Sequence, residues 1–268
     1  SWLPSDIGFV RYLKQAARKN LDRLLYWIAR PKLHSVSKAV SDHFGKIYGI
    51  GPDQIYHVGR GRSCPNTITS DKRMGIRRNV FKCSEEDFVC INVGRQEYQK
   101  NQAALVSAFK NLKGKNFKLV IVGREGEETA KINQAISKND LFKEVEILGF
   151  RHDVTDLLQA SDIFLFPSFI EGAAGAVIEA MAASLPVIAS DIPPHRELLS
   201  NKDGVLLVKS VEEIPLLISE LSKDSPSLKK MGEVNFSIFQ SEFCDDIIVY
   251  KFEKLLRSLY DENPRVRV

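Results

Sequence analysis

Short apolar runs alternate with amphipathic stretches between residues 87 and 208. The runs hold four to eight residues and lie at 87–94, 118–123, 145–149, 163–166, 186–190 and 204–208. Helical spacing of apolar residues separates them, at 101–112, 127–138, 153–160 and from Gly175 onward. Strands that are apolar on both sides are typical of a parallel sheet with helices on both faces. The pattern predicts an α/β fold with a doubly wound parallel sheet over residues 85–242.

A basic amphipathic helix is predicted near the start of the chain. Residues 9–29 place apolar side chains at helical spacing and five basic residues on the other side, and Pro31 ends the helix. One interpretation is a surface helix whose apolar stripe packs on its own domain. The other is a peripheral contact of residues 9–30 with anionic lipid or an acidic acceptor.

A second helix is predicted soon after. It begins near Ser35 or Ser37, either of which can cap it, and ends at Gly49 or Gly51. With the first helix it forms a mainly helical N-terminal segment. We assign residues 1–60 to this segment.

The periodicity disappears between residues 51 and 84, apart from a short strand predicted at Gln54–Val58. Gly, Arg and turn-forming residues dominate there, so we assign residues 61–84 to an interdomain linker. A final amphipathic helix is predicted within residues 243–268. Four arginines of the linker region could contact phosphate, but solvated linker charges explain them better: Arg60, Arg62, Arg77 and Arg78.

Composition and charge exclude several classes of protein. The chain of 268 residues has no apolar run approaching the roughly 18 residues that span a bilayer, and no leader is visible. Its four cysteines show neither zinc spacing nor a disulfide framework, so we expect a cytoplasmic protein without a metal site. Residues 1–80 carry 15 Lys and Arg against 5 Asp and Glu. This basic third must face a partner or the rest of the protein; nucleic acid is a minor alternative that we do not adopt.

The stretch from Phe166 to Asp191 carries the strongest candidate chemistry. A buried strand is followed by a Gly-containing loop, a helix and a second buried strand. Glu171 and Glu179 bracket the loop with seven residues between them. Small residues let a ligand approach the backbone, and the helix start offers free N–H groups to an anion. Carboxylates on each side accept hydrogen bonds from hydroxyls, which suits a phosphorylated sugar or a nucleotide.

Two other loops follow predicted strands and carry polar candidates. Arg95 and Lys100 come after the first strand, where two cations can neutralise a diphosphate. Phe150 and Arg151 come after the third strand and could offer backbone groups or a stacking face to a base. No strand-to-helix turn carries the dinucleotide fingerprint GxGxxG, and no P-loop is present, which argues against a dinucleotide-dependent enzyme and an NTPase.

These motifs together resemble the retaining nucleotide-sugar glycosyltransferases of the GT-B fold, family 4 (glycosyl transferases group 1). The matching features run in the family's order: VGR with a lysine a few residues on, KLVIVG, the GxxxDVxxLL stretch, and FPS followed by two glutamates and EAMAASLPVIASD. The resemblance is strong over residues 85–210 and weak over 33–84. It implies a Rossmann-like C-terminal donor domain preceded by the end of an N-terminal acceptor domain.

The resemblance also implies roles for individual residues. Arg95 and Lys100 would bind the donor diphosphate, beside Gly94 of the VGR motif. Glu171 would bind hydroxyls of the transferred sugar, and Glu179 would bind the ribose.

Backbone groups complete the implied site. Those near Phe150 and Arg151 would meet the base, and the loop residues Gly172, Ala173, Ala174 and Gly175 would help to bind phosphate.

The family transfers a hexose from a UDP or GDP sugar to a glycan or lipid-linked acceptor with retention of configuration. It needs no cofactor and no metal ion. Many relatives carry EGFG where this chain has EGAAG from Glu171, which alters the backbone contacts expected at phosphate.

The chain also begins with Ser1 and lacks most of the acceptor domain that the family carries, so we expect a truncated protein. Alternatives are a non-catalytic nucleotide-sugar-binding or scaffold domain and a sugar-nucleotide epimerase. His195 and Glu197 are interpreted as residues of a helix start, where capping explains them.

Overall fold

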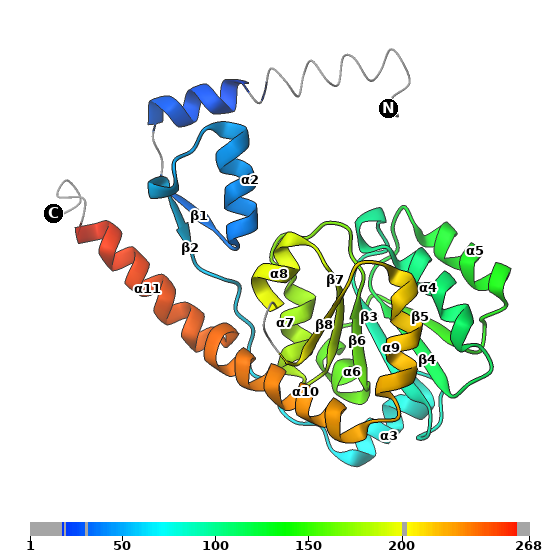
Figure 1. The fold of residues 1–268 in the computed structure, drawn as a ribbon. Coiled ribbons are helices and arrows are strands. Elements are labelled where there is room, and N and C mark those ends of the chain that lie inside the picture. Colours follow the sequence, from blue (N-terminus) through cyan, green and yellow to red (C-terminus); the bar gives the residue numbers. More distant parts are fainter. Residues whose placement is uncertain (1–17, 19, 30–31, 200–202, 262–268) are drawn as a thin grey trace, which may run out of the picture.

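A six-stranded sheet forms the centre of the protein. The computed structural model describes residues 18, 20–29, 32–199 and 203–261 (Figure 1). The strand order is β5-β4-β3-β6-β7-β8, and all neighbouring strands are parallel. The strands are β3 (Phe88–Val93), β4 (Phe117–Val122), β5 (Val145–Gly149), β6 (Ile163–Phe166), β7 (Val187–Ser190) and β8 (Val205–Val208). The predicted doubly wound sheet is confirmed.

Helices cover both faces of the sheet (Figure 1). They are α4 (Gln102–Phe109), α5 (Thr129–Asn139), α6 (Val154–Ala160), α7 (Gly175–Ala182), α8 (Pro193–Leu199), α9 (Ile214–Leu221) and α10 (Ser225–Ile238), whereas α11 (Asp245–Asp261) extends away from the sheet toward β1 (Leu33–Ser35) and β2 (Ile55–His57) (Figure 1). Alternate strand residues enter two separate cores. In β3, Val89 and Ile91 pack with α6 and α7, whereas Cys90 packs with α4 and α5. Apolar residues are needed on both sides of each strand, which explains the continuous runs in the sequence.

The strand order creates a switch point between β3 and β6. The chain leaves β3 for β4 and β5 on one side, then returns to place β6 on the other side of β3. The loops after β3 and β6 therefore diverge at the carboxyl edge of the sheet. Open α/β sheets bind their ligands in the crevice between two such loops.

The N-terminal segment is a small unit of mixed structure. Residues 20–29 are helical, and the part of the predicted first helix before residue 18 lies outside the described residues. β1 (Leu33–Ser35) pairs in parallel with β2 (Ile55–His57), which confirms the predicted short strand. α2 (Lys38–Tyr48) has Ser37 as its N-cap, with its side chain accepting a hydrogen bond from the backbone of Val40.

The linker region contains a helix that the sequence analysis missed. α3 (Ser70–Asn79) begins at Thr69, whose side chain accepts a hydrogen bond from the backbone N–H of Lys72. Only Ile76 and Arg77 of this helix are buried, so no apolar stripe reveals it. The interpretation of the linker arginines as solvated charges holds for the exposed Arg78 but is wrong for Arg77.

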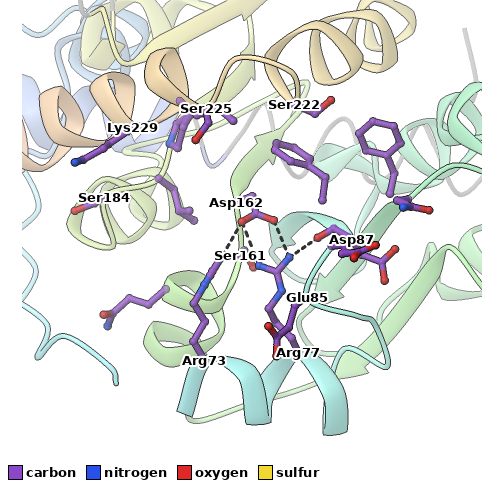
Figure 2. Close-up of a pocket in the computed structure, with 18 of the residues that line it drawn as sticks. Arg73, Arg77, Glu85, Asp87, Ser161, Asp162, Ser184, Ser222, Ser225 and Lys229 are labelled. Atoms are coloured by element: carbon purple, nitrogen blue, oxygen red, sulfur yellow. Dashed lines mark hydrogen bonds and ion pairs between the residues drawn. The ribbon is translucent and has the colours of Figure 1, made fainter. Parts of the chain in front are cut away.

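Arg77 belongs to an ion-pair network at the amino edge of the sheet. Figure 2 shows Arg73 and Arg77 extending from α3 toward Asp162, beside a cavity of about 750 Å³. Asp162 accepts hydrogen bonds from Arg73 (2.6 Å), from Arg77 (3.0 and 3.2 Å) and from the backbone N–H of Val89 (2.7 Å). Arg77 also donates to the carbonyl groups of Ala160 and Asp87. Asp162 is thus bound by both arginines and by the start of β3, and this network attaches α3 to the sheet.

His195 is a fully buried polar residue of α8. Its Nδ1 lies 2.8 Å from the carbonyl oxygen of Ser190, its ring contacts Phe166, and its Nε2 has no hydrogen-bond partner among the described residues. Burial lowers the pKa of His195 below the ordinary value of 6.5. The ring is therefore neutral at pH 7 and supports the fold as a neutral donor to Ser190.

Replacing Asp162 tests the network at the amino edge. We expect Asp162→Ala to lower the free energy of unfolding by about 3–5 kcal/mol, because Arg77 is left buried without a counter-charge. Glu233→Ala, which breaks the exposed pair between Lys229 and Glu233, is the control and should cost about 1 kcal/mol or less. Urea unfolding measures both values. A loss for Asp162→Ala as small as that of the control would contradict the structural role.

The burial of His195 predicts a pH dependence of stability. Its pKa is depressed in the folded state, so its contribution is present above pH 6.5 and is lost as the pH falls below that value. Wild type should lose more stability between pH 7.5 and pH 5.5 than His195→Gln, as measured by urea unfolding. His152→Gln alters an exposed histidine and should keep the wild-type dependence. Equal pH dependence of wild type and His195→Gln would show that burial does not depress this pKa.

Candidate functional site

The loops after β3 and β4 each begin with a glycine, and these two glycines lie against each other. The N–H of Gly94 donates to the carbonyl of Val122, at 2.9 Å. Gly123 follows β4 with φ of 151°, and a Cβ atom there would lie 2.0 Å from the carbonyl oxygen of Gly94. A Cβ atom on Gly94 would meet the stem of Lys100 at 3.3 Å. Gly94 thus lets the Lys100 side chain lie against the end of the strand.

Lys100 and Glu171 form an ion pair across the switch point. Lys100 ends the 3-10 turn Tyr98–Lys100 after β3, and Glu171 lies in the loop after β6. Their Nζ and Oε1 atoms are 2.6 Å apart, with side-chain exposures of 15% and 9%. The same ammonium lies 5.0 Å from the ring centroid of Phe166, in cation–π contact. The structure thus joins two residues that the sequence analysis assigned to different parts of the donor.

The loop from Glu171 leads into α7 through a strained residue. Ala174 is buried and adopts φ of 37°, a left-handed conformation that a non-glycine residue rarely takes. No side chain caps the helix that begins at Gly175. In the first turn the N–H of Val177 donates to the Ala174 carbonyl at 2.9 Å, whereas the N–H groups of Gly175 and Ala176 have no helical acceptor and are available to an anion.

Glu179, one turn into α7, is paired with an arginine that the sequence analysis set aside. Arg62 Nε lies 2.6 Å from Glu179 Oε1, and both side chains are about one-third exposed, at 29% and 31%. The interpretation of Arg62 as a solvated linker charge is therefore wrong. No local pattern links two residues so far apart in the sequence, and only the fold brings them together.

Residues predicted to meet the base share one cavity with two that were predicted near the diphosphate. Gly94, Arg95, Phe150 and Arg151 all line a cavity of about 460 Å³ at the carboxyl edge of the sheet. Arg95 is mostly exposed and forms an ion pair with Glu97 at 2.9 Å. Side chains from three strand ends therefore meet at one opening.

The polar groups of this cavity are held by neighbours. Phe150 is 51% exposed, and the guanidinium of Arg124 lies 4.5 Å from its ring centroid. Arg151 donates two hydrogen bonds to Asp153, at 2.8 and 2.6 Å, which raises the pKa of Arg151. The exposed ring of Phe150 is the flat apolar surface on which a base could stack.

Gly172 and Ala173 line a smaller cavity beside the N-terminal segment, of about 190 Å³. Glu197 lies on the same cavity, and its carboxylate accepts hydrogen bonds from the backbone N–H groups of Lys38 and Ala39 at 2.5 and 2.7 Å. It therefore caps α2, a helix of a distant segment, and the interpretation of Glu197 as a cap of its own helix is wrong. His195 is likewise a buried residue that bonds the Ser190 carbonyl, not a cap.

Two other kinds of site are not found among the described residues. No group of three or more His, Cys, Asp or Glu side chains is placed to hold a metal ion in that part of the chain. No helix among those residues has the length and apolarity to cross a bilayer.

Curated relatives that match the sequence are glycosyltransferases. Over 116 residues, the chain is 40% identical to an uncharacterised glycosyltransferase of Methanocaldococcus jannaschii, covering 42% of this chain and 28% of the relative. Over 182 residues, it is 36% identical to the UDP-Gal:alpha-D-GlcNAc-diphosphoundecaprenol alpha-1,3-galactosyltransferase of Escherichia coli, covering 65% and 46%. The chain thus spans less than half the length of either relative.

Solved structures share the fold at low sequence identity. A glycosyltransferase of Rickettsia africae superposes with a TM-score of 0.82 at 22% identity, over 91% of this chain and 68% of that one. The Anabaena protein HepE, solved in complex with UDP and glucose, gives a TM-score of 0.80 at 19% identity, over 90% and 67%.

A model of a protein family's sequences matches the part of the chain that forms the sheet and most of its helices. The model for glycosyl transferases group 1 matches residues 76–236, a span that runs from α3 to α10. It includes both ion-paired glutamates and the loop between them. The chain belongs to the family of glycosyl transferases group 1.

Proposed function

We propose that this chain is the donor-binding part of a retaining glycosyltransferase, which moves a hexose from a nucleoside-diphosphate sugar to a glycan or lipid-linked acceptor. The observation that carries the proposal is the Lys100–Glu171 ion pair at the switch point of the sheet, beside the cavity lined by Arg95 and Phe150. This is the position where open α/β sheets bind nucleotides. It offers cations to a diphosphate and carboxylates to sugar hydroxyls.

The donor is proposed to lie along the carboxyl edge of the sheet. Its base would occupy the cavity at Phe150 and Arg151, and its diphosphate would lie between Arg95, Lys100 and the start of α7. Glu179 would accept hydrogen bonds from the ribose, and Glu171 from the transferred sugar. A UDP-type donor is supported by two similar proteins, since HepE was solved with UDP and the Escherichia coli enzyme is named for UDP-Gal.

Charge explains how this edge would promote transfer. Negative charge grows on the diphosphate as its bond to the sugar breaks, and fixed cations stabilise that charge. Arg95 is mostly exposed and can turn to the ligand, while Lys100 would exchange Glu171 for a phosphate oxygen. Retention is proposed from the family resemblance, in which the departing diphosphate assists the acceptor on the same face of the sugar.

We propose that the acceptor binds to an N-terminal domain, and that residues 1–60 are the last portion of that domain. Residues 61–84 would link it to the donor domain at 85–242, and α11 within 243–268 would pack back toward it. The helix at residues 20–29 exposes more than half of five large apolar side chains, Leu21, Leu24, Leu25, Trp27 and Ile28. With the basic residues around them, these support a peripheral contact with the cytoplasmic face of a membrane.

Nucleotide binding tests the proposed donor site. We expect the chain to bind UDP or GDP in titration calorimetry, and Arg95→Ala and Glu179→Ala each to weaken binding about tenfold or more, since each removes a charge-assisted hydrogen bond. Lys138→Ala removes an exposed charge near the end of α5 and should bind as wild type does. NAD should not bind. A folded protein that binds neither UDP nor GDP would contradict the proposal.

The ion pair at the switch point predicts non-additive effects on stability. Lys100→Met should lower the free energy of unfolding by about 3–5 kcal/mol, because the nearly buried Glu171 loses its counter-charge. Adding Glu171→Gln should restore part of that loss, since a neutral amide needs no cation. Urea unfolding of wild type, both single variants and the double variant gives the coupling. Strictly additive losses would show that the two charges do not interact.

A further inference from the structure

Two guanidinium groups lie at the start of α7, where electrostatics disfavours them. A Cβ atom built on Gly175, the first residue of the helix, would lie 2.5 Å from Nη2 of Arg62 and 3.1 Å from Nη1 of Arg60. Helix N-termini carry a partial positive charge and attract anions. Two cations beside such a terminus repel it and each other. Glu179 supplies one negative charge against them, so the arrangement lacks an anion.

Arg62 keeps free hydrogen-bond donors at this position. Of its five N–H groups, one on Nε donates to Glu179 and one on Nη1 donates to the carbonyl of Gly61 at 2.8 Å. Within the described part of the chain, its other three N–H groups have no partner. Arg60 makes no hydrogen bond or ion pair with the described residues. Donors without acceptors, beside a helix start that is also uncapped, match the requirements of a phosphate group.

The fold fixes the backbone that carries Arg62. Its N–H donates to the carbonyl of Phe243, and its own carbonyl accepts from the N–H of Asp245, both at 3.0 Å. Ser63 Oγ donates to the Asp245 carboxylate at 2.6 Å. A Cβ atom on Gly61 would lie 2.5 Å from the Asp245 carboxylate and 3.3 Å from its Cα, so the glycine lets the two segments lie this close. Arg62 is therefore held over α7 by the segment that enters α11.

We propose that Arg62 is a further donor-site residue, which binds the diphosphate of the nucleotide sugar through its free Nη groups while its Nε holds Glu179 toward the ribose. Arg60 adds a second positive charge at the same helix start. This inference rests on the proposed function and adds a cation from outside the sheet domain. A diphosphate between Arg62 and the first turn of α7 supplies the anion that the arrangement lacks, and it strengthens the stabilisation of the leaving group.

The test distinguishes phosphate binding by Arg62 from two other roles of the Arg62–Glu179 contact, namely orienting Glu179 alone and blocking Glu179. Dissociation constants of UDP and GDP, and of uridine and guanosine, are measured by NMR titration of the 268-residue chain, wild type and Arg62→Ala. We expect Arg62→Ala to weaken the bound nucleoside diphosphate about 10- to 100-fold, the effect of a lost charge-assisted contact, and to change nucleoside binding less than about threefold. Arg78→Ala removes an exposed arginine of α3 as the matched control and should leave both constants unchanged.

Three results would overturn the inference. If Arg62→Ala weakens the binding of the nucleoside diphosphate and of the nucleoside equally, Arg62 only orients Glu179. If Arg62→Ala binds the diphosphate more tightly than wild type, the Arg62–Glu179 ion pair blocks Glu179 and inhibits binding. No change would leave Arg62 outside the site.

A second variant guards against a folding defect, which thermal melting of Arg62→Ala would reveal. Arg62→Lys keeps the positive charge, so its diphosphate affinity should lie between those of wild type and Arg62→Ala. If Arg62→Ala does not fold, a folded Arg62→Lys with an affinity equal to that of wild type or reduced equally for diphosphate and nucleoside would count against the phosphate contact. If wild type binds neither UDP nor GDP, the proposed function fails and this inference falls with it. If wild type binds and Arg95→Ala weakens binding while Arg62→Ala does not, only the inference fails.

Discussion

The ion pair between Lys100 and Glu171 is the interaction around which the carboxyl edge of the sheet is organised. It joins the loop after β3 to the loop after β6, the two loops that diverge at the switch point. Nearly buried charges are stable only when each has its partner, so the pair fixes the position of both loops. Gly94 at the end of β3 leaves room for the lysine stem, and Phe166 at the end of β6 receives its ammonium.

Paired charges recur around this edge. Glu179 is held by Arg62, Arg95 is paired with Glu97, and the Arg151 guanidinium is held by Asp153. Each carboxylate keeps a cation near it until a more strongly charged anion competes for that cation. A diphosphate is such an anion: at Lys100 its arrival would release the Glu171 carboxylate for hydroxyl groups, whereas Arg62 would bind it through free Nη groups and keep Glu179 on Nε. These three pairs hold their cations close to where a phosphate would lie, whereas Arg60 and three N–H groups of Arg62 at the start of α7 have no acceptor among the described residues.

The amino edge of the sheet shows the opposite use of charge. Arg73 and Arg77 converge on Asp162, which also accepts a backbone hydrogen bond from the start of β3 (Figure 2). Here the Asp162 carboxylate is bound on both oxygens by neighbours of the same chain, and the result is attachment of α3 to the sheet. The cavity beside this network, of about 750 Å³, is larger than the one of about 460 Å³ at the carboxyl edge, yet Asp162 at its wall is already bound by Arg73 and Arg77. Size alone therefore does not distinguish a binding site from a structural joint.

The sequence by itself determined the sheet, its covering helices and the location of the candidate site. Continuous apolar strands require burial on both faces, and parallel strands bring their carboxyl ends to one edge, so the order of the strands along the chain is enough to group Arg95, Lys100, Phe150 and Glu171. The tertiary structure alone decided which charges meet. α3 has no apolar stripe, Arg62 finds Glu179 across 117 residues, and Glu197 caps a helix 159 residues away. Such contacts depend on the packing of segments that are distant in the sequence, and the local pattern of apolar and polar residues does not predict them.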